Sequence, residues 1–186
     1  MKLVNYIICI ILAHICTFNA YAQENKRIYF DAEAFDLKGH VKVCGNDKFS
    51  IDGALFIPQH EYERIEREGN RISRIVYEDT PSAEVYTEFC WENGRVVMSS
   101  YSAVSSYTDE FGTNLSSDYN IREYKYNTSG YIIEMTESNG KALSWTYRYE
   151  YIEFDNHGNW TKRRRITVIE DYDRNIEIET RNIIYY

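Results

Sequence analysis

A strict alternation of large apolar and polar side chains over residues 143–151 restricts this chain more than any other feature of its sequence. The even positions carry Ser, Thr, Arg and Glu. The odd positions are Leu143, Trp145, Tyr147, Tyr149 and Tyr151. Successive side chains of a β-strand point to opposite faces, so this period of two predicts a strand with one face on a core. Tyr131, Ile133 and Met135 follow the same rule less regularly, as do Ile176 and Ile178.

Glycine and asparagine separate such segments along the chain. Clusters of these residues occur at 52–53, 68–70, 93–94, 128–130 and 155–159. Both residue types accept the positive φ of tight hairpin turns, so each cluster predicts a hairpin tip. The 18 Tyr and 3 Trp, against 2 Pro, also favour strands. The chain is therefore expected to be all-β, an antiparallel meander of hairpin repeats with about ten to twelve strands, forming a curved open sheet or half-barrel.

Two segments do not follow the alternation. Residues 59–67 fit either a helix or the first arm of a hairpin that turns at the following glycine. The segment from Ser102 to Asp118 is rich in Ser, Thr and Asn and carries few large apolar anchors. We expect this second segment to be a mobile loop, because it offers little apolar surface to bury.

The N-terminal residues have the order of a secretory signal peptide. Lys2 precedes an apolar stretch, and small residues stand at Ala20 and Ala22, where a signal peptidase would cut. A membrane anchor is the alternative, but the stretch is short and no stop-transfer charges follow it. Export to the periplasm or secretion is expected. The expected organisation is residues 1–22 as signal peptide, 23–36 as a lead-in segment and 37–186 as one β domain.

The charge balance of the chain bears on its partners. The formal net charge is −8, and removal of Lys2 with the signal makes it one unit more negative. Acidic chains are repelled by phosphate backbones and anionic lipid headgroups, so nucleic acid and anionic membranes are disfavoured. No transmembrane span is expected after signal cleavage. The expected partner is an envelope glycan or an envelope protein.

Cys44 and Cys90 remain after the signal, in a compartment that permits disulfides. If they pair, the bond closes a long loop and stabilises the domain by about 3 to 4 kcal/mol through loop-closure entropy. Two buried unpaired thiols are the alternative, because the sequence alone does not place the Cβ atoms.

The turns belong to a loose repeat of aromatic residue, spacer, aromatic or acidic residue, short turn and glycine. Residues 126–131 (Tyr-Asn-Thr-Ser-Gly-Tyr) and 154–160 (Phe-Asp-Asn-His-Gly-Asn-Trp) show it best. This pattern resembles the YD-repeat (Rhs-like) group of bacterial exported proteins. The resemblance implies antiparallel β-hairpins that wind into a sheet. The few units present cannot form the shell in which large members enclose a toxin, so that role is not carried over.

A basic run, Lys-Arg-Arg-Arg at residues 162–165, invites interpretation as a phosphate site. In a strand, however, neighbouring side chains face opposite ways, so the run divides into two pairs. Hairpin pairing places Glu150 and Glu153 on one neighbouring strand and Glu177 and Glu179 on the other, within cross-strand reach. A charge-paired sheet is therefore predicted.

Catalytic and metal-binding patterns are scarce in this sequence. The histidines are widely spaced, and no phosphate-loop, dinucleotide-binding or nucleophile-elbow glycine pattern occurs. Residues 155–159 and 171–175 resemble calcium loops but lack the glutamate at the twelfth position, so both are predicted to be hairpin turns. We expect no catalytic residue, no bound metal and no cofactor.

The aromatic face of residues 143–151 remains as the candidate site. Trp145, Tyr147, Tyr149 and Tyr151 either stack on a ligand or fill the core beneath the sheet. The expected function is that of an exported, non-catalytic binding or envelope-associated interaction module. The alternatives are a glycan-active enzyme with a carboxylate pair near residues 102–118 and a small protective partner of a secreted toxin.

Overall fold

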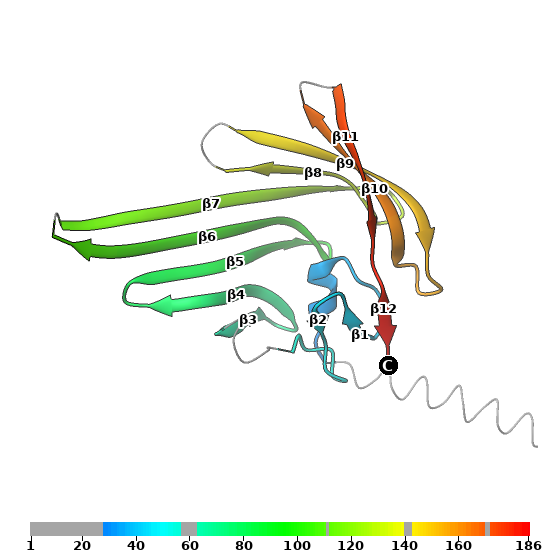
Figure 1. Ribbon diagram of the computed structural model, residues 1–186. Coiled ribbons are helices and arrows are strands. Elements are labelled where there is room, and N and C mark those ends of the chain that lie inside the picture. Colours follow the sequence, from blue (N-terminus) through cyan, green and yellow to red (C-terminus); the bar gives the residue numbers. More distant parts are fainter. Residues whose placement is uncertain (1–27, 57–62, 111, 140–142, 170–171) are drawn as a thin grey trace, which may run out of the picture.

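The computed structural model describes residues 28–56, 63–110, 112–139, 143–169 and 172–186. The predicted signal peptide lies outside these residues. Strands that follow one another along the chain also pair side by side in one antiparallel sheet of nine strands, which is open at β3 and β11 (Figure 1). The predicted meander of hairpins in an open sheet is therefore confirmed. The strands of this large sheet are β3 (Arg64–Glu68), β4 (Arg71–Thr80), β5 (Ala83–Glu92), β6 (Arg95–Asp109), β7 (Gly112–Tyr126), β8 (Ile132–Ser138), β9 (Ser144–Phe154), β10 (Trp160–Ile169) and β11 (Tyr172–Thr180).

A second, smaller sheet joins the two ends of the described chain. Its strand order is β12-β1-β2, with β12 (Ile183–Tyr185), β1 (Val41–Cys44) and β2 (Asp47–Lys48). A 3-10 helix, η1 (Asp31–Phe35), precedes it. Together they lie on one face of the large sheet, which we call the inner face (Figure 1). The part of the chain that the structure describes contains no helix with the length and apolar character needed to cross a membrane.

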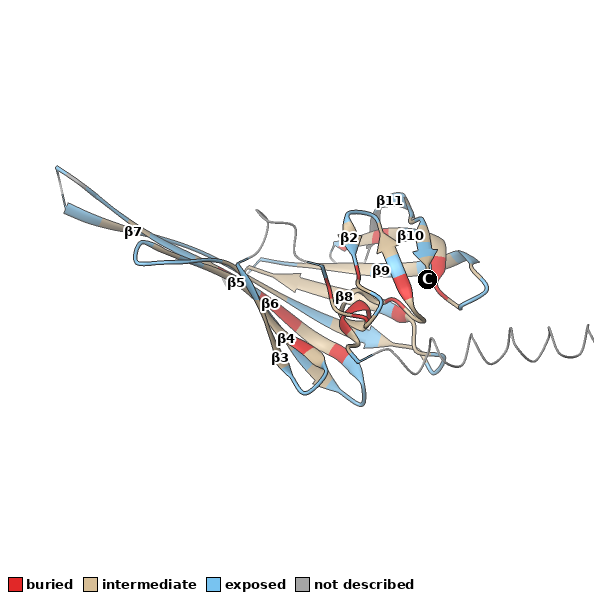
Figure 2. Cartoon of the chain, turned by 90° about the horizontal axis from the view of Figure 1, so that it is seen from below, coloured by how far each residue is buried: buried red, intermediate tan, exposed pale blue. Residues whose placement is uncertain are grey.

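The main core lies between η1, the small sheet and the first strands of the large sheet. Ile72 and Ile75 of β4 are 0% and 2% exposed and pack with Ala32 of η1 and Val41 of β1. Figure 2 shows buried residues gathered where these elements meet. Each such aliphatic side chain contributes about 1.5 to 3 kcal/mol by leaving water. Residues 28–36, expected to be a lead-in segment, thus supply part of this core.

Polar contacts also hold the N-terminal segment against the sheet. Asp31 is fully buried, forms an ion pair with Arg67 of β3, and accepts a hydrogen bond of 2.7 Å from the backbone N–H of Leu55. Asn159 is 1% exposed, and its amide exchanges two hydrogen bonds with the backbone of Lys38, at 2.7 and 2.8 Å. A buried charge or amide needs such partners, so both contacts fix the position of η1.

The expected loop over residues 102–118 is wrong. Residues 102–109 and 112–118 form the distal halves of β6 and β7, which pair continuously from Met98↔Glu123 to Asp109↔Gly112. The hairpin extends away from η1 and the small sheet, and its far end is exposed (Figures 1 and 2). Leu115 is 78% exposed there. The sequence lacks alternation because no layer covers either face, so neither face requires apolar side chains.

The alternation over residues 131–136 is shifted by a β-bulge. Tyr126 pairs with Ile132, whereas Lys125 pairs with Glu134, so Ile133 is the extra residue of the bulge. Residues before the bulge therefore face the side opposite to the one that strict alternation predicts. Ile132 is consequently buried at 8% exposure and Ile133 is 42% exposed. The predicted inward position of Ile133 is wrong for this reason.

The alternation on β11 has the opposite sense to that expected for a core strand. Ile176 and Ile178 are 60% and 54% exposed, because they lie on the outer face of the edge strand. Glu177 and Glu179 occupy the inner positions, where they pair with arginines of β10. In contrast, β3 confirms the hairpin alternative for its part of residues 59–67; residues 57–62 lie outside the described chain.

Three of the predicted hairpin tips share one hydrogen-bond pattern. In residues 50–54, 127–131 and 155–159 the first N–H donates to the fifth carbonyl, and the glycine N–H donates to the first carbonyl. Gly53, Gly130 and Gly158 have φ of 87°, 85° and 75°, which favours glycine. The repeat therefore encodes a recurring turn structure, and the turn predictions at these positions are confirmed.

Candidate functional site: a tyrosine-lined cavity on the inner face

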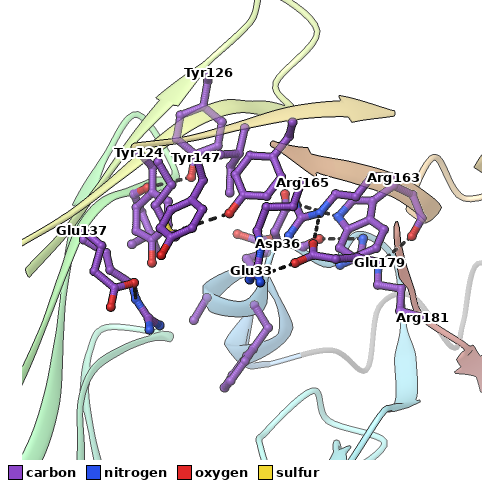
Figure 3. A pocket seen from close by; sticks show the side chains of 18 residues that line it. Glu33, Asp36, Tyr124, Tyr126, Glu137, Tyr147, Arg163, Arg165, Glu179 and Arg181 are labelled. Atoms are coloured by element: carbon purple, nitrogen blue, oxygen red, sulfur yellow. Dashed lines mark hydrogen bonds and ion pairs between the residues drawn. The ribbon is translucent and has the colours of Figure 1, made fainter. Parts of the chain in front are cut away.

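A cavity of about 320 Å³ lies between η1 and the inner face of β7 to β11 (Figure 3). Four tyrosines form much of its lining: Tyr124 and Tyr126 from β7, and Tyr147 and Tyr149 from β9. Strand register places them there, because Tyr124 pairs with Met135 and Met135 pairs with Tyr147 across β8. Side chains directly opposite on neighbouring strands share a face.

The four aromatic residues predicted from β9 divide into two groups. Tyr147 and Tyr149 line the cavity. Tyr151 is half-buried outside its lining, where it contacts the rings of Tyr131 and Trp160 at centroid distances of 5.2 and 6.5 Å. Trp145 is half-buried opposite Glu137 and is also absent from the lining. The structure thus brings together two of the predicted residues as a candidate site.

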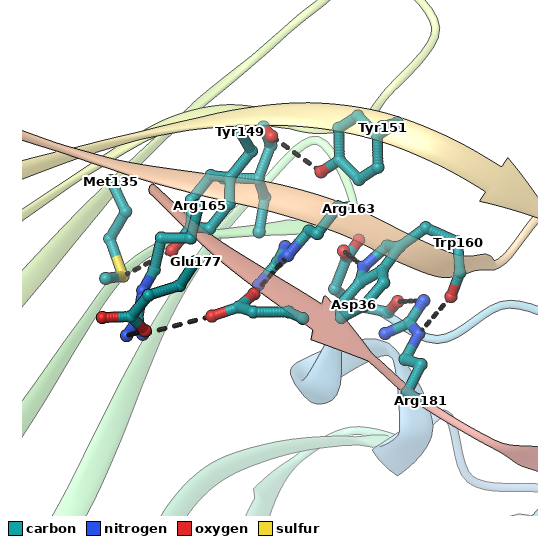
Figure 4. Close-up of polar contacts among 11 residues, drawn as sticks. Asp36, Met135, Tyr149, Tyr151, Trp160, Arg163, Arg165, Glu177 and Arg181 are labelled. Carbon is teal, nitrogen blue, oxygen red and sulfur yellow. Dashed lines mark hydrogen bonds and ion pairs between the residues drawn. The ribbon is translucent and has the colours of Figure 1, made fainter. Parts of the chain in front are cut away.

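The tyrosine hydroxyls of this region are held as hydrogen-bond donors. Tyr151 donates to the carbonyl of Ile132 at 2.7 Å, and Tyr149 approaches the Met135 sulfur at 3.9 Å (Figure 4). Burial raises the pKa of Tyr149 to about 12, with the charge of Arg163 opposing the rise. Burial likewise raises the pKa of Tyr151 to about 12. Both hydroxyls therefore stay protonated at neutral pH.

The basic run divides between the two faces, as predicted. On the outer face Lys162 pairs with Glu153 at 3.3 Å and Arg164 with Glu150 at 3.1 Å. On the inner face, Arg163 Nε lies 2.6 Å from Glu179 and Arg165 Nη2 lies 2.6 Å from Glu177 (Figure 4).

Arg163 links this ion-pair network to the aromatic lining. Its guanidinium carbon lies 3.9 Å from the ring centroid of Tyr149 and 4.0 Å from that of Trp160. Arginine stacked on aromatic rings and paired with a carboxylate loses much of its rotational freedom. Sequence analysis did not identify Arg163, Arg165 or Glu179 as cavity residues. Strand pairing could have indicated them, because Arg163 lies opposite Tyr151, Arg165 lies opposite Tyr149, and Glu179 lies opposite Arg163.

Asp36 closes the cavity at the end of η1. It terminates the helix with φ of 55°, and its Oδ2 accepts a hydrogen bond of 3.2 Å from Trp160 Nε1. Arg181 donates to the Asp36 carbonyl at 3.0 Å and to the Trp160 carbonyl at 2.6 Å. Burial raises the pKa of the Asp36 carboxyl, with Arg181 partly opposing the rise. Burial lowers the pKa of Arg181.

Formal charges in the cavity lining balance. Arg122 of β7 pairs with Glu137 of β8 at 3.0 Å, in addition to the pairs of β10 and β11. The lining contains Arg122, Arg163, Arg165 and Arg181 together with Glu33, Asp36, Glu137 and Glu179. A balanced lining of this kind gives little net attraction for a strongly charged ligand, while it offers many hydrogen-bonding groups.

Two further cavities flank this one on the same face. One of about 390 Å³ is lined by residues of β4 to β7, including Tyr77 and Tyr101, and shares Arg122 with the first. Another of about 400 Å³ lies beyond η1 and shares Asp36 and Tyr126 with the first. Because they share lining residues, the three cavities form a series along the inner face.

The cysteines do not form the disulfide that was one of the two alternatives. Both thiols are free; Cys44 is half-buried on β1 and Cys90 is exposed on β5. Phe89 packs against the core on the inner face, so its neighbour Cys90 points outward by strand alternation. The buried position expected for Cys90 is therefore also wrong. Burial raises the pKa of the Cys44 thiol.

Neither predicted turn provides a metal site in the described residues. Asp155 Oδ1 accepts hydrogen bonds of 2.9 Å from the backbone N–H groups of His157 and Asn159, as in a side-chain-supported turn. The turn predicted over residues 171–175 is wrong for its described part, because residues 172–175 belong to β11 and pair with β10; residues 170 and 171 lie outside the described chain. Within the described ranges, no three His, Cys, Asp or Glu side chains gather as metal ligands.

Comparison of the chain with protein-family models, with curated proteins and with solved structures gives no match.

Proposed function

We propose that this protein is an exported, non-catalytic binding module that holds a glycan of the cell envelope against the inner face. The observation that carries this proposal is the cavity lined by Tyr124, Tyr126, Tyr147 and Tyr149 and bordered by charge-balanced ion pairs. Tyrosine presents an apolar ring and a polar hydroxyl, which suits the mixed surface of a sugar ring.

The ion pairs supply the polar half of this recognition. Guanidinium and carboxylate groups are planar and can each form two hydrogen bonds, so they suit adjacent hydroxyls of a sugar. Glu179 contacts Arg163 at 2.6 Å and Arg165 at 3.1 Å, which holds all three side chains in place without a ligand. A preordered site loses less side-chain entropy on binding.

The hairpin units support a second part of the proposal, that the domain is built from YD-like repeats. The three turns share one hydrogen-bond pattern, and each has the glycine of the repeat as its fourth residue. In the copy at residues 154–160, Asp155 accepts a hydrogen bond from its own turn, and Asn159 holds the segment after η1 through Lys38. These contacts give a physical reason for Asp and Asn at these positions of the repeat.

The test is a binding screen of the purified protein against envelope glycans and envelope extracts, with matched aromatic variants. Tyr147→Ala is expected to weaken glycan binding about threefold to tenfold, because one stacking surface is lost. Trp145→Ala, on the same strand but outside the cavity, is expected to leave binding unchanged. Circular dichroism and thermal unfolding verify that both variants fold. Unchanged binding in folded Tyr147→Ala, or no glycan bound by the wild type, would contradict the proposal.

A glycan-active enzyme is the second candidate, and Asp36 is the observation in its favour. This carboxyl borders the cavity and burial raises its pKa, as for a general acid. Glu137 and Glu179, the neighbouring carboxylates, are already ion-paired with arginines. Incubation with the bound glycan discriminates the two functions: release of reducing ends that Asp36→Asn abolishes supports the enzyme, and no release supports the binding module.

A further inference from the structure

The cavity of about 400 Å³ beyond η1 differs from its neighbour in charge. It lies between the segment that follows η1, the turn from β5 to β6 and the turn from β7 to β8, and its cationic side chains are Lys38, Arg71 and Arg95. Its acidic side chains are Glu33 and Asp36. Cations therefore exceed carboxylates in this cavity, although the whole chain has a formal charge of −8.

Aromatic rings hold two of these cations in place. The guanidinium carbon of Arg95 lies 5.4 Å from the ring centroid of Tyr126, and Lys38 Nζ lies 3.8 Å from that of Tyr131. Among the described residues, neither has a carboxylate within the 4.0 Å of an ion pair. A cation over a π face keeps its full formal charge, and its N–H donors remain available to an anion.

Arg71 is only weakly neutralised. Its Nη2 lies 3.5 Å from Glu33 Oε2, and its guanidinium carbon lies 5.4 Å from the ring centroid of Trp91. The Nε atom of Arg71 is buried without a hydrogen-bond partner within the described residues. A buried donor without an acceptor is unfavourable, and such donors need an explanation.

Glycines leave the space that two of the guanidinium groups occupy. A Cβ added at Gly130 would lie 2.7 Å from Arg95 Nη2, and one at Gly94 would lie 3.4 Å from Arg71 Nη2. Both glycines belong to repeat turns and line the cavity. The repeat thus positions two cations as well as bending the chain.

The two acidic residues offset only part of this charge. Glu33 lies 3.5 Å from Arg71. Asp36 accepts a hydrogen bond from Trp160, and its charge interacts with Arg181 more strongly than with Lys38. The cavity therefore keeps a formal excess of one positive charge.

We propose that this cavity is an anion subsite that takes the acidic group of an acidic glycan, whether a carboxylate, a sulfate or a phosphate. This inference rests on the proposed function, because the cavity shares Asp36, Val96 and Tyr126 with the tyrosine-lined one. A ligand with a sugar ring on the tyrosines can place its acidic group among Lys38, Arg71 and Arg95. Arginine and lysine together recognise such oxyanions through charge-assisted hydrogen bonds.

The test compares an acidic oligosaccharide identified in the glycan screen with its carboxyl-reduced or desulfated form, and titrates inorganic phosphate separately. The wild type is expected to bind the acidic form at least about tenfold more tightly, as one charge-assisted contact allows. Arg95→Gln is expected to remove this preference and the phosphate response. Lys125→Gln makes the same charge change on an exposed side chain that pairs with Glu134 on the outer face, and should retain both.

A second pair of variants tests position instead of charge. Gly130→Ala displaces Arg95 and should reduce the preference for the acidic form. Gly69→Ala is the control, because Gly69 also has a positive φ, 63°, but a Cβ there meets open space, so the preference should persist. Both introduce backbone strain, so the comparison isolates the displaced guanidinium.

The outcomes separate this inference from the proposed function. Equal binding of acidic and neutral forms by the wild type overturns the anion subsite and leaves the glycan-binding module intact. Phosphate binding that Arg95→Gln abolishes, with no glycan bound at all, upholds the anion subsite and overturns its assignment to a glycan. A preference that survives Arg95→Gln overturns the role given to Arg95.

Discussion

The strands that border the tyrosine-lined cavity and the distal half of the β6–β7 hairpin share the same backbone structure and differ in what covers them. Around the cavity, β8 to β11 face η1 and present tyrosine, arginine and glutamate. In the distal hairpin, residues 102–109 pair with residues 112–119, yet large side chains such as Leu115 and Tyr107 are 78% and 59% exposed. Alternation in a sequence therefore reports the covering of one face, and hydrogen-bonded pairing alone does not produce it.

The two regions also differ in what stabilises them. The covered region derives its stability from buried apolar area, ion pairs and buried hydrogen bonds, whereas the distal hairpin has backbone pairing and exposed side chains. An isolated two-stranded hairpin is marginally stable in water. The distal hairpin is consequently ordered by its continuity with the rest of β6 and β7, which lie in the large sheet between β5 and β8.

The largest expected effect comes from truncating one side chain in the covered part of the large sheet, at its main core, and one in the distal hairpin. Ile72→Ala should lower the free energy of unfolding by about 2 to 5 kcal/mol, because Ile72 is 0% exposed and a cavity would remain. Leu115→Ala should change it by less than about 0.5 kcal/mol. Urea unfolding followed by tryptophan fluorescence measures both. Similar losses for the two variants would break the comparison, since they would show that the distal hairpin buries its side chains.

A smaller effect is expected from the pH dependence that Asp36 gives to the covered region. Burial raises the Asp36 pKa above its ordinary 3.8, so the folded state keeps this proton at a pH where the unfolded chain has lost it. The stabilisation from this proton is full at low pH and is lost as pH rises through the folded pKa. Asp36→Asn removes that dependence, so its stability relative to the wild type should increase as pH rises above about 4. A difference in unfolding free energy that stays constant with pH would contradict the assignment.

The smallest effect is expected from shortening the distal hairpin. Replacement of residues 104–117 by Asn-Gly joins Ala103 to Asp118, which face each other in the register, through a favoured two-residue turn. The unfolding free energy should change by less than about 1 kcal/mol, and glycan binding by the tyrosine-lined cavity should persist. A loss of several kcal/mol would show that this hairpin supports the core. Retained stability with lost binding would instead place part of the ligand on it.

Much of the architecture was predictable from short-range patterns. The turns at Gly53, Gly130 and Gly158 and the inward side of β9 followed from residue type and period. The division of residues 162–165 between outer and inner carboxylates also followed, since hairpin pairing of adjacent segments fixes the neighbours. The β8 bulge was not predictable, because one extra residue reverses the faces without a distinctive composition.

The candidate site was predictable only in part. Tyr147 and Tyr149 were identified from their alternation, but nothing in the sequence separates them from Tyr151, which packs among other rings. Asp36 and Trp160 are distant in the sequence yet hydrogen-bonded, and this contact forms one side of the cavity. The sequence likewise did not show whether Cys44 and Cys90 meet. They lie on different sheets, and both thiols are free.

By itself, the sequence determined where the chain extends, where it turns and which neighbouring charges meet, because these depend on backbone dihedral preferences and on pairing between adjacent segments. Tertiary structure alone decided which face of the sheet η1 and the small sheet cover. Because these elements cover only part of the inner face, a cavity forms between η1 and β7 to β11, and the distal half of the β6–β7 hairpin stays uncovered. The physical reason is that covering is a contact between segments far apart in the chain, set by the packing of whole layers, and no local period records it.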